Sequence, residues 1–282
     1  MENSTEVTAF LLLGLTDDPH LRLPLFLAFL LIYAITALGN LGLVLLILLD
    51  PSLHSPMYFF LGNLALVDFG YSSAVTPTVM AGLLTGHQVI SYTACAAQMY
   101  SFAVFATVED YLLAVMAYDR YAAVCWCAIG FLSASTFVGD TFSLLFCKSN
   151  IIHHFFCDVP AVMVFSCSDR HHHELVVVYV GSFNIFFAFL IVGVSYTFIF
   201  STVLRTHSMA GHWKAFSTCA SHLTTVSIFY GTVIFMYLQP SSSHSMDTDK
   251  IVSVFYTMVI PMLNPVVYSL RNKEVKSAFL KV

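Results

Sequence analysis

The sequence contains little charge for its size. Only 10% of its 282 residues are Asp, Glu, Lys or Arg, whereas 58% are hydrophobic and the mean hydropathy is +0.81. A soluble domain carries about 25% charged residues, so this chain cannot cover its surface as a soluble protein does, and lipid must cover much of it. The chain also lacks a basic patch that would follow phosphates, which excludes nucleic acid as a partner.

Several sequence signatures are missing as well. Met1 to Val7 contains no Lys or Arg, so the first apolar span is expected to act as its own insertion signal instead of a cleavable signal peptide. His172-His173-Glu174 is not the His-Glu-x-x-His set of a metallopeptidase. Neither a repeat between the two halves nor a line of charges indicates a transporter or channel. We therefore expect no enzyme activity and no organic cofactor.

The sequence contains many long apolar segments. A bilayer core about 30 Å thick requires roughly 20 apolar residues in a helix. Six segments meet this requirement: 23–49, 58–84, 95–124, 175–204, 215–238 and 251–270.

A seventh segment, Trp126 to Val138, is apolar but short. A helix of its 13 residues reaches only about 20 Å, so it is either a buried or re-entrant segment or a damaged span. Residues 1–22 are acidic and residues 271–282 are basic, and a basic end favours the cytoplasm. Ends on opposite sides of a membrane require an odd number of crossings, which favours seven.

The cysteines indicate the same topology. Cys147, Cys157 and Cys167 lie in one polar loop, and Cys95 opens the third span. With the N-terminus outside, Cys95 faces the oxidising side, where disulfides persist. The loop can join it there only if the chain crosses the membrane twice between residues 95 and 147. Spacing alone does not determine the pairing.

The two ends of the chain carry their own patterns. Asn3-Ser4-Thr5 is a glycosylation sequon, which is consistent with an extracellular segment 1–22. The cytoplasmic tail 271–282 has apolar residues at helical spacing, which predicts either a helix on the inner leaflet or a frayed tail. These residues are Val275, Ala278, Phe279 and Val282. Residues 1–282 are expected to form a single domain.

Five ordered motifs carry a family resemblance. They are LHSPMYFFL (53–61), MAYDRY (116–121), Ser195-Tyr196, KAFSTCASHL (214–223) and PMLNPVVYSLRN (261–272). In this order they resemble the motifs of odorant (olfactory) receptors, a branch of the rhodopsin-like G-protein-coupled receptors. The resemblance implies an all-α membrane protein with a seven-transmembrane helix bundle. By comparison with this family, the second inner loop and part of the fourth helix are missing after Cys125, so the resemblance implies a truncated fourth span.

The resemblance assigns a switch to buried acids. Asp68 and Glu109 are expected to approach each other around a sodium ion or a shared proton, with Asn40 and Asn264 bonding nearby and Pro265 in the same motif as Asn264. The alternative is a structural polar network that holds the helices together.

A second implied switch lies at the inner end of the third span. Asp119 would hold Arg120 at rest, and Tyr196 and Tyr268 would move toward Arg120 on activation. The alternative for the charged pair is snorkelling to the interface. His222 is either a packed core residue or part of the moving inner end of the sixth span.

The resemblance also implies the pairing in the outer loop. Cys95 would pair with Cys157, and Cys147 with Cys167, and both disulfides would restrict a lid over the ligand site. The histidines of this loop either form a solvated face or bind copper or zinc: His153, His154, His171, His172 and His173.

The ligand site is expected to be apolar and free of Asp and Lys, with Thr107, Asn184 or Tyr230 orienting the ligand through hydrogen bonds. The alternative for every residue is ordinary helix packing. The expected residues are Phe102, Ala103, Ala106, Thr107, Gly181, Asn184, Ile185, Tyr230, Val233, Ile234 and Thr257.

The implied function is reception of a small, volatile, mostly hydrophobic odorant at the plasma membrane. The multi-pass chain, with its N-terminus outside, would activate a heterotrimeric G protein of the stimulatory olfactory type. The alternative is a truncated, non-signalling receptor retained inside the cell.

Overall fold

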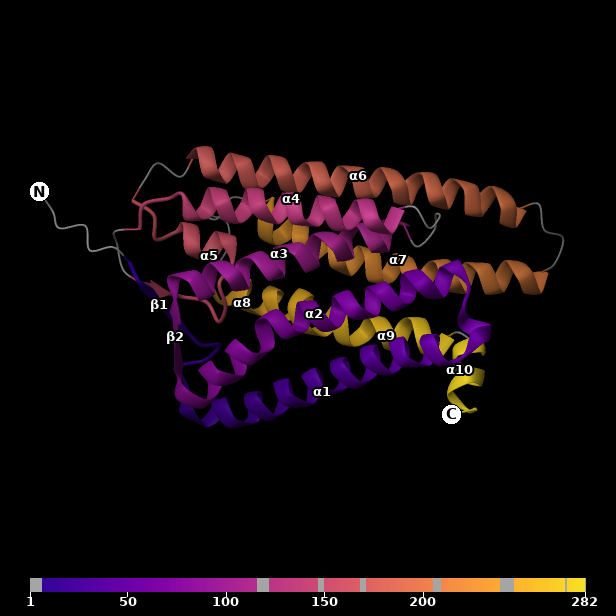
Figure 1. Ribbon diagram of the computed structural model, residues 1–282, viewed down its shortest axis with the longest axis horizontal. Coiled ribbons are helices and arrows are strands. Elements are labelled where there is room, and N and C mark those ends of the chain that lie inside the picture. The colour runs from indigo at the N-terminus through magenta and orange to yellow at the C-terminus, as the bar shows by residue number, and fades with distance from the viewer. Residues whose placement is uncertain are drawn as a thin grey trace, which may run out of the picture.

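Helices dominate the computed structural model, which describes residues 7–115, 122–146, 150–167, 171–204, 209–238, 246–271 and 273–281. The long helices run side by side along one direction of an elongated bundle (Figure 1). They are α1 (Pro19–Leu49), α2 (Pro56–Thr85), α3 (Tyr92–Val115), α4 (Ala122–Phe142), α6 (His171–Leu204) and α7 (Met209–Tyr237). A last column consists of α8 (Met246–Val254), a π-helical turn (Phe255–Val259) and α9 (Ile260–Arg271).

Each apolar span predicted from the sequence overlaps one of these helices, although α3 ends at Val115 and residues 122–124 of the third predicted span belong to α4. Within the described residues, three stretches are both long and apolar enough to cross a bilayer: Pro19–Leu49, His171–Phe198 and Thr248–Val267. Other long helices carry polar side chains that point into the bundle, among them Asp68 on α2 and Glu109 on α3, both completely buried. Apolar length thus identified the helices, and the inward-facing polar groups explain why some spans are less apolar.

The fourth helix is longer than the predicted segment Trp126 to Val138. α4 has 21 residues and ends at Phe142, so at 1.5 Å per residue it reaches about 30 Å, the thickness of the bilayer core. The helix extends beyond the apolar segment because hydrophobicity does not set helix ends; Asp140 continues the helix. Gly130 permits close packing on α3, since a Cβ there would lie 2.7 Å from Val108 Cγ2.

The outer end of the bundle is closed by a small sheet and a disulfide. β1 (Ala9–Leu13) pairs antiparallel with β2 (His87–Ser91) and parallel with β3 (Ile151–Ile152). The Cys95–Cys157 disulfide ties α3 to the loop that carries β3. This confirms the predicted pairing and places Cys95 and the histidine-rich loop at the same end of the bundle. Cys167 is disulfide-bonded as well, while its predicted partner Cys147 lies outside the described residues.

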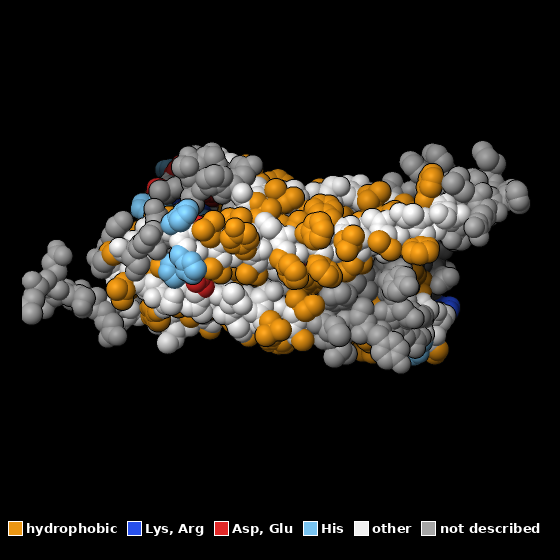
Figure 2. Space-filling model, turned by 90° about the horizontal axis from the view of Figure 1, so that it is seen from above, with side chains coloured by type: hydrophobic (Ala, Val, Ile, Leu, Met, Phe, Trp, Pro, Cys, Tyr) orange, Lys and Arg blue, Asp and Glu red, His pale blue; other side chains and the backbone are white. Residues whose placement is uncertain are grey.

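Large apolar side chains cover the outside of the bundle. Figure 2 shows hydrophobic side chains spread along one face, with histidines gathered toward one end. On α6, Phe183, Phe186 and Phe198 are exposed. An exposed apolar surface of this extent indicates contact with lipid, because a soluble monomer does not expose patches this large.

The opposite end of the bundle carries the C-terminal helix α10 (Lys273–Phe279) (Figure 1). Val275 and Ala278 are buried against the ends of α1 and α2, whereas Phe279 is exposed. The Lys281 ammonium lies 3.3 Å from an oxygen of Asp50, just after α1. The tail is therefore helical as expected, but part of its apolar face packs on the bundle; Val282 lies outside the described residues.

Candidate functional site: a cavity beneath the outer loop

A cavity of about 90 Å³ lies between α3, α6, α7 and the outer loop. Its wall is largely apolar and aromatic, as a pocket for a small hydrophobic ligand requires. The residues that line it are Tyr71, Met99, Phe102, Ala103, Ala106, Thr107, Asp110, Phe137, Asp158, Val159, Val177, Gly181, Asn184, Ile185, Phe229, Val233, Tyr237 and Tyr256.

Most of the residues proposed from the sequence meet in this wall. Phe102, Ala103, Ala106, Thr107, Gly181, Asn184, Ile185 and Val233 line the cavity. Tyr230, Ile234 and Thr257 do not line it. Thr257 donates to the backbone oxygen of Ser253 at 2.7 Å, within its own helical column.

The three side chains expected to orient a ligand are engaged within the protein. The Thr107 hydroxyl donates to the backbone oxygen of Ala103 at 2.9 Å. The Asn184 side-chain oxygen accepts from the Tyr111 hydroxyl at 2.8 Å, and its amide donates to Ser133 at 3.3 Å. Thr107 is thus bonded within α3, and Asn184 connects α6 to α3 and α4, so both are less available to a ligand than the sequence suggested.

Tyr230, the third side chain expected to orient a ligand, is also engaged within the protein. Its hydroxyl donates to the backbone carbonyl of Asp110 at 3.2 Å, and its ring packs on Phe189 with ring centroids 4.7 Å apart. Tyr230 therefore links α7 to α3 and packs against α6.

The expectation of a wall without acids was wrong. Asp110 on α3 and Asp158 in the outer loop both line the cavity. Asp110 follows Ala103, Ala106 and Thr107 at the spacing i, i+3, i+4, i+7, which places all four on one face of a helix. This spacing could have identified Asp110 as a wall residue from the sequence.

Asp158 is held by an outer polar network. Its two carboxylate oxygens accept from the hydroxyls of Tyr237 at 2.8 Å and Tyr256 at 3.0 Å, and one also accepts from the Val159 N–H at 2.8 Å. Burial raises the pKa of Asp158 to about 6, and these hydrogen bonds oppose the rise. The network fastens the loop onto α7 and the π-helical turn, directly over the cavity.

His154 extends this network and corrects another expectation. Its ring lies 3.3 Å from the Ser253 hydroxyl, which contacts the Tyr256 hydroxyl at 2.9 Å. His154 is buried, whereas the solvated-face interpretation had placed every loop histidine in water. Burial, reinforced by the charge of Lys250, lowers the pKa of His154 to about 3, so its ring is neutral.

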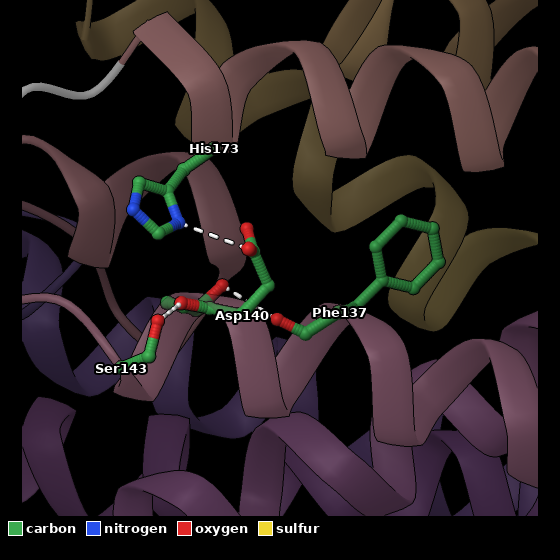
Figure 3. A network of polar contacts seen from close by, with 5 residues as sticks. Phe137, Asp140, Ser143 and His173 are labelled. Atoms are coloured by element: carbon green, nitrogen blue, oxygen red, sulfur yellow. Dashed lines mark hydrogen bonds and ion pairs between the residues drawn. The ribbon is translucent and has the colours of Figure 1, made fainter.

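His173, at the start of α6, contacts α4. Figure 3 shows its ring directed at the Asp140 carboxylate, with Ser143 on the following turn. The two groups lie 2.9 Å apart and form an ion pair when the ring is protonated. Among the described residues, no group of three or more His, Cys, Asp and Glu side chains is arranged to hold a metal ion.

A second buried site lies deeper in the bundle. The Asn264 amide on α9 donates to Asp68 at 3.1 Å and to Glu109 at 3.3 Å, so it joins α2, α3 and α9. Asn40 donates to the backbone oxygen of Pro261 at 3.0 Å. Asp68 and Glu109 thus come together as expected, and Asn264 bridges them.

The inner switch residues are only partly described. Asp119 and Arg120 lie outside the described residues, as does Asn3, and the side chains of His222 and Tyr268 are not described either. The Tyr196 hydroxyl donates to the backbone oxygen of Cys219 at 3.3 Å, linking α6 to α7. Pro265 is buried in α9, close to Gly39 on α1.

Known proteins share this architecture and this sequence. A family model described as "7 transmembrane receptor (rhodopsin family)" matches residues 39–268. Human olfactory receptor 5B3 is 67% identical, with 100% of this chain and 96% of the relative covered. Mouse olfactory receptor 5B21 is 58% identical, with 100% and 95% covered. Squid rhodopsin matches with a TM-score of 0.60 at 13% identity, over 94% of this chain and 86% of that structure, which shows the fold alone.

The alignments are longer than the chain. The match to olfactory receptor 5B3 runs over 302 residues, against 282 residues here. The relatives therefore carry residues that this chain lacks, while the position of the missing stretch after Cys125 stays a prediction. The family model and the full-length identities establish that the chain belongs to the olfactory receptors of the rhodopsin family, multi-pass proteins of the plasma membrane that are not enzymes.

Proposed function

We propose that this receptor binds a small hydrophobic odorant in the cavity beneath the outer loop and then activates a heterotrimeric G protein of the stimulatory olfactory type. The observation that carries the proposal is the largely apolar cavity between α3, α6 and α7, closed by a loop that the Cys95–Cys157 disulfide and Asp158 hold in place. Such a cavity removes most of a small ligand's apolar surface from water.

The inner switch completes the proposal. Asp119 holds Arg120 at rest, and binding releases Arg120 toward Tyr196 and Tyr268, as the family motifs imply. Tyr196 bridges α6 and α7 through Cys219, which suits a residue that changes partners when these helices separate. We expect Arg120→Ala to abolish the cyclic AMP response to odorant while surface protein is retained; an unchanged response would contradict the latch.

A cation is proposed at the deeper acid site. Asp68 Oδ2, Glu109 Oε2 and Asn264 Oδ1 are buried and lack hydrogen-bond partners, and oxygen donors of this kind suit a hard cation such as sodium; a shared proton is the alternative. Replacing potassium by sodium should raise the melting temperature of the purified receptor, and Glu109→Gln should remove this difference. Equal melting temperatures in both salts would favour the proton.

The main test is a cyclic AMP screen against an odorant panel in cells that express the tagged receptor. Surface staining of an N-terminal tag on unpermeabilised cells accompanies it. Activation by at least one odorant, with the tag accessible, supports the proposal. Abundant internal protein without surface staining would favour the retained, non-signalling receptor, an alternative motivated by the residues this chain lacks. A version with the missing stretch restored serves as the matched control.

A further inference from the structure

Asp110 stands out among the cavity residues because its carboxylate has no partner. Its side chain is only 6% exposed, it lines the cavity, and neither of its oxygens makes a hydrogen bond. The Tyr230 hydroxyl lies beside this carboxylate and interacts with it, but the hydrogen bond that it donates goes to the backbone carbonyl of Asp110 at 3.2 Å. A buried carboxyl group without a donor is unfavourable, so this one is satisfied only if something entering the cavity supplies the donor.

The neighbouring acids differ from Asp110 because each has at least one bonded carboxylate oxygen, whereas both oxygens of Asp110 are unbonded. Glu109 accepts from Asn264, and the two oxygens of Asp158 accept from Tyr237 and Tyr256. Asp158 faces the same cavity with its oxygens occupied. The cavity wall therefore contains two carboxylates: Asp158, whose oxygens are hydrogen-bonded, and Asp110, whose oxygens are not.

We propose that Asp110 determines the head-group specificity of the cavity: it selects small apolar molecules that carry one hydrogen-bond donor, and an alkylammonium most strongly. The inference rests on the proposed odorant-binding function and names the ligand class. An ammonium group pairs its charge with the carboxylate and forms a charge-assisted hydrogen bond, while the hydrocarbon body fills the apolar wall. An alcohol offers a neutral donor, and an aldehyde of the same skeleton offers none.

The unbonded carboxylate of Asp110 allows the receptor to distinguish ligands that carry a hydrogen-bond donor from ligands that lack one. A site built to bond a donor rejects the analogue that lacks it, because the buried group is then left unpaired. Thr107 and Asn184 cannot replace Asp110 in this role, since both are bonded within the bundle.

The test uses two ligand series, a linear and a cyclic six-carbon skeleton, each as primary amine, alcohol and aldehyde. Ligand-induced thermal stabilisation of the purified full-length receptor reports binding, and cyclic AMP reports signalling. In the wild type we expect the amine to act at concentrations at least tenfold below those of the aldehyde, with the alcohol between them. Asp110→Asn should weaken the amine at least tenfold and leave the aldehyde within twofold.

Asp140→Asn is the matched control, because it makes the same chemical change on an acid of α4 that does not line the cavity. It should keep the preference for the amine over the aldehyde. Equal concentrations for amine and aldehyde in the wild type would overturn the inference even if Asp110→Asn fails to fold. Amine-selective stabilisation without any cyclic AMP response would uphold the inference and count against the signalling function.

Discussion

The outer end and the middle of the bundle treat their polar groups in opposite ways. At the outer end, the disulfide, the three-stranded sheet and the tyrosines around Asp158 leave the loop fixed. In the middle, Asp68, Glu109 and Asp110 are buried with carboxylate oxygens that lack partners. A carboxylate with both oxygens bonded, as in Asp158, resists change, whereas one with unbonded oxygens responds to an ion, a proton or a ligand. The comparison suggests that the outer end holds the cavity and the middle responds to it.

Removing the Cys95–Cys157 disulfide should have the largest effect of the changes considered, because it loosens the outer end of the bundle. The Cys95–Cys157 bond closes a sequence separation of 62 residues, so its loss destabilises the folded state by about 4 kcal/mol in the chain-entropy treatment. We expect Cys157→Ser to lose most surface staining and to lower the melting temperature. Cys219→Ser, which removes a free thiol, is the control; equal behaviour of the two variants would show that the outer end does not depend on this tether.

The Asp158 network should show the next largest effect, as a dependence on pH. The folded-state pKa of Asp158, about 6, lies above the ordinary aspartate pKa of 3.8, so the folded state keeps its proton when the unfolded state has lost it. Stability is therefore greatest below about pH 4 and falls as the pH rises to about 6, by roughly 3 kcal/mol. His154 opposes this fall over the same range, so Asp158→Asn should leave a melting temperature that rises from pH 4 to pH 7.

His154 contributes the opposite slope in the same experiment. Its folded-state pKa of about 3 lies below the ordinary histidine pKa of 6.5, so stability is lost as the pH falls below about 6.5. His154→Gln should therefore leave a melting temperature that falls from pH 4 to pH 7, the opposite of the rise expected for Asp158→Asn. Identical profiles for the two variants would contradict the assignment of both slopes.

In the middle of the bundle, Asn264→Leu should cost about 2 kcal/mol, because it removes the donor shared by Asp68 and Glu109. Asn40→Leu removes only bonds to neutral backbone oxygens of Thr36 and Pro261 and should cost less. The measurement is thermal unfolding in detergent. A larger loss for Asn40→Leu would mean that the acid pair does not rely on its bridge.

The smallest effect is expected for the contact between Asp140 and His173, which joins α4 to α6 at partly exposed positions. Partly solvated ion pairs contribute about 0–1 kcal/mol and are screened by salt. Asp140→Asn should lower the melting temperature slightly at low ionic strength and not at all in high salt. A large, salt-independent loss would indicate that this contact is structural for α4.

The sequence alone determined the helices, the family and part of the cavity wall. Apolar length located the spans, and motif order identified the receptor family. Helical spacing explains why residues such as Phe102, Ala106 and Thr107 share one wall. These features are local or periodic along the chain, so they are visible without coordinates.

The tertiary structure decided which polar groups remain free. Thr107 and Asn184 looked available in the sequence but are bonded within the bundle, whereas Asp110 is unpartnered. The length of α4 and the burial of His154 were decided in the same way, by packing against other elements. A hydrogen-bond partner is set by which helices meet and at what depth, and that information belongs to the fold and not to any one segment.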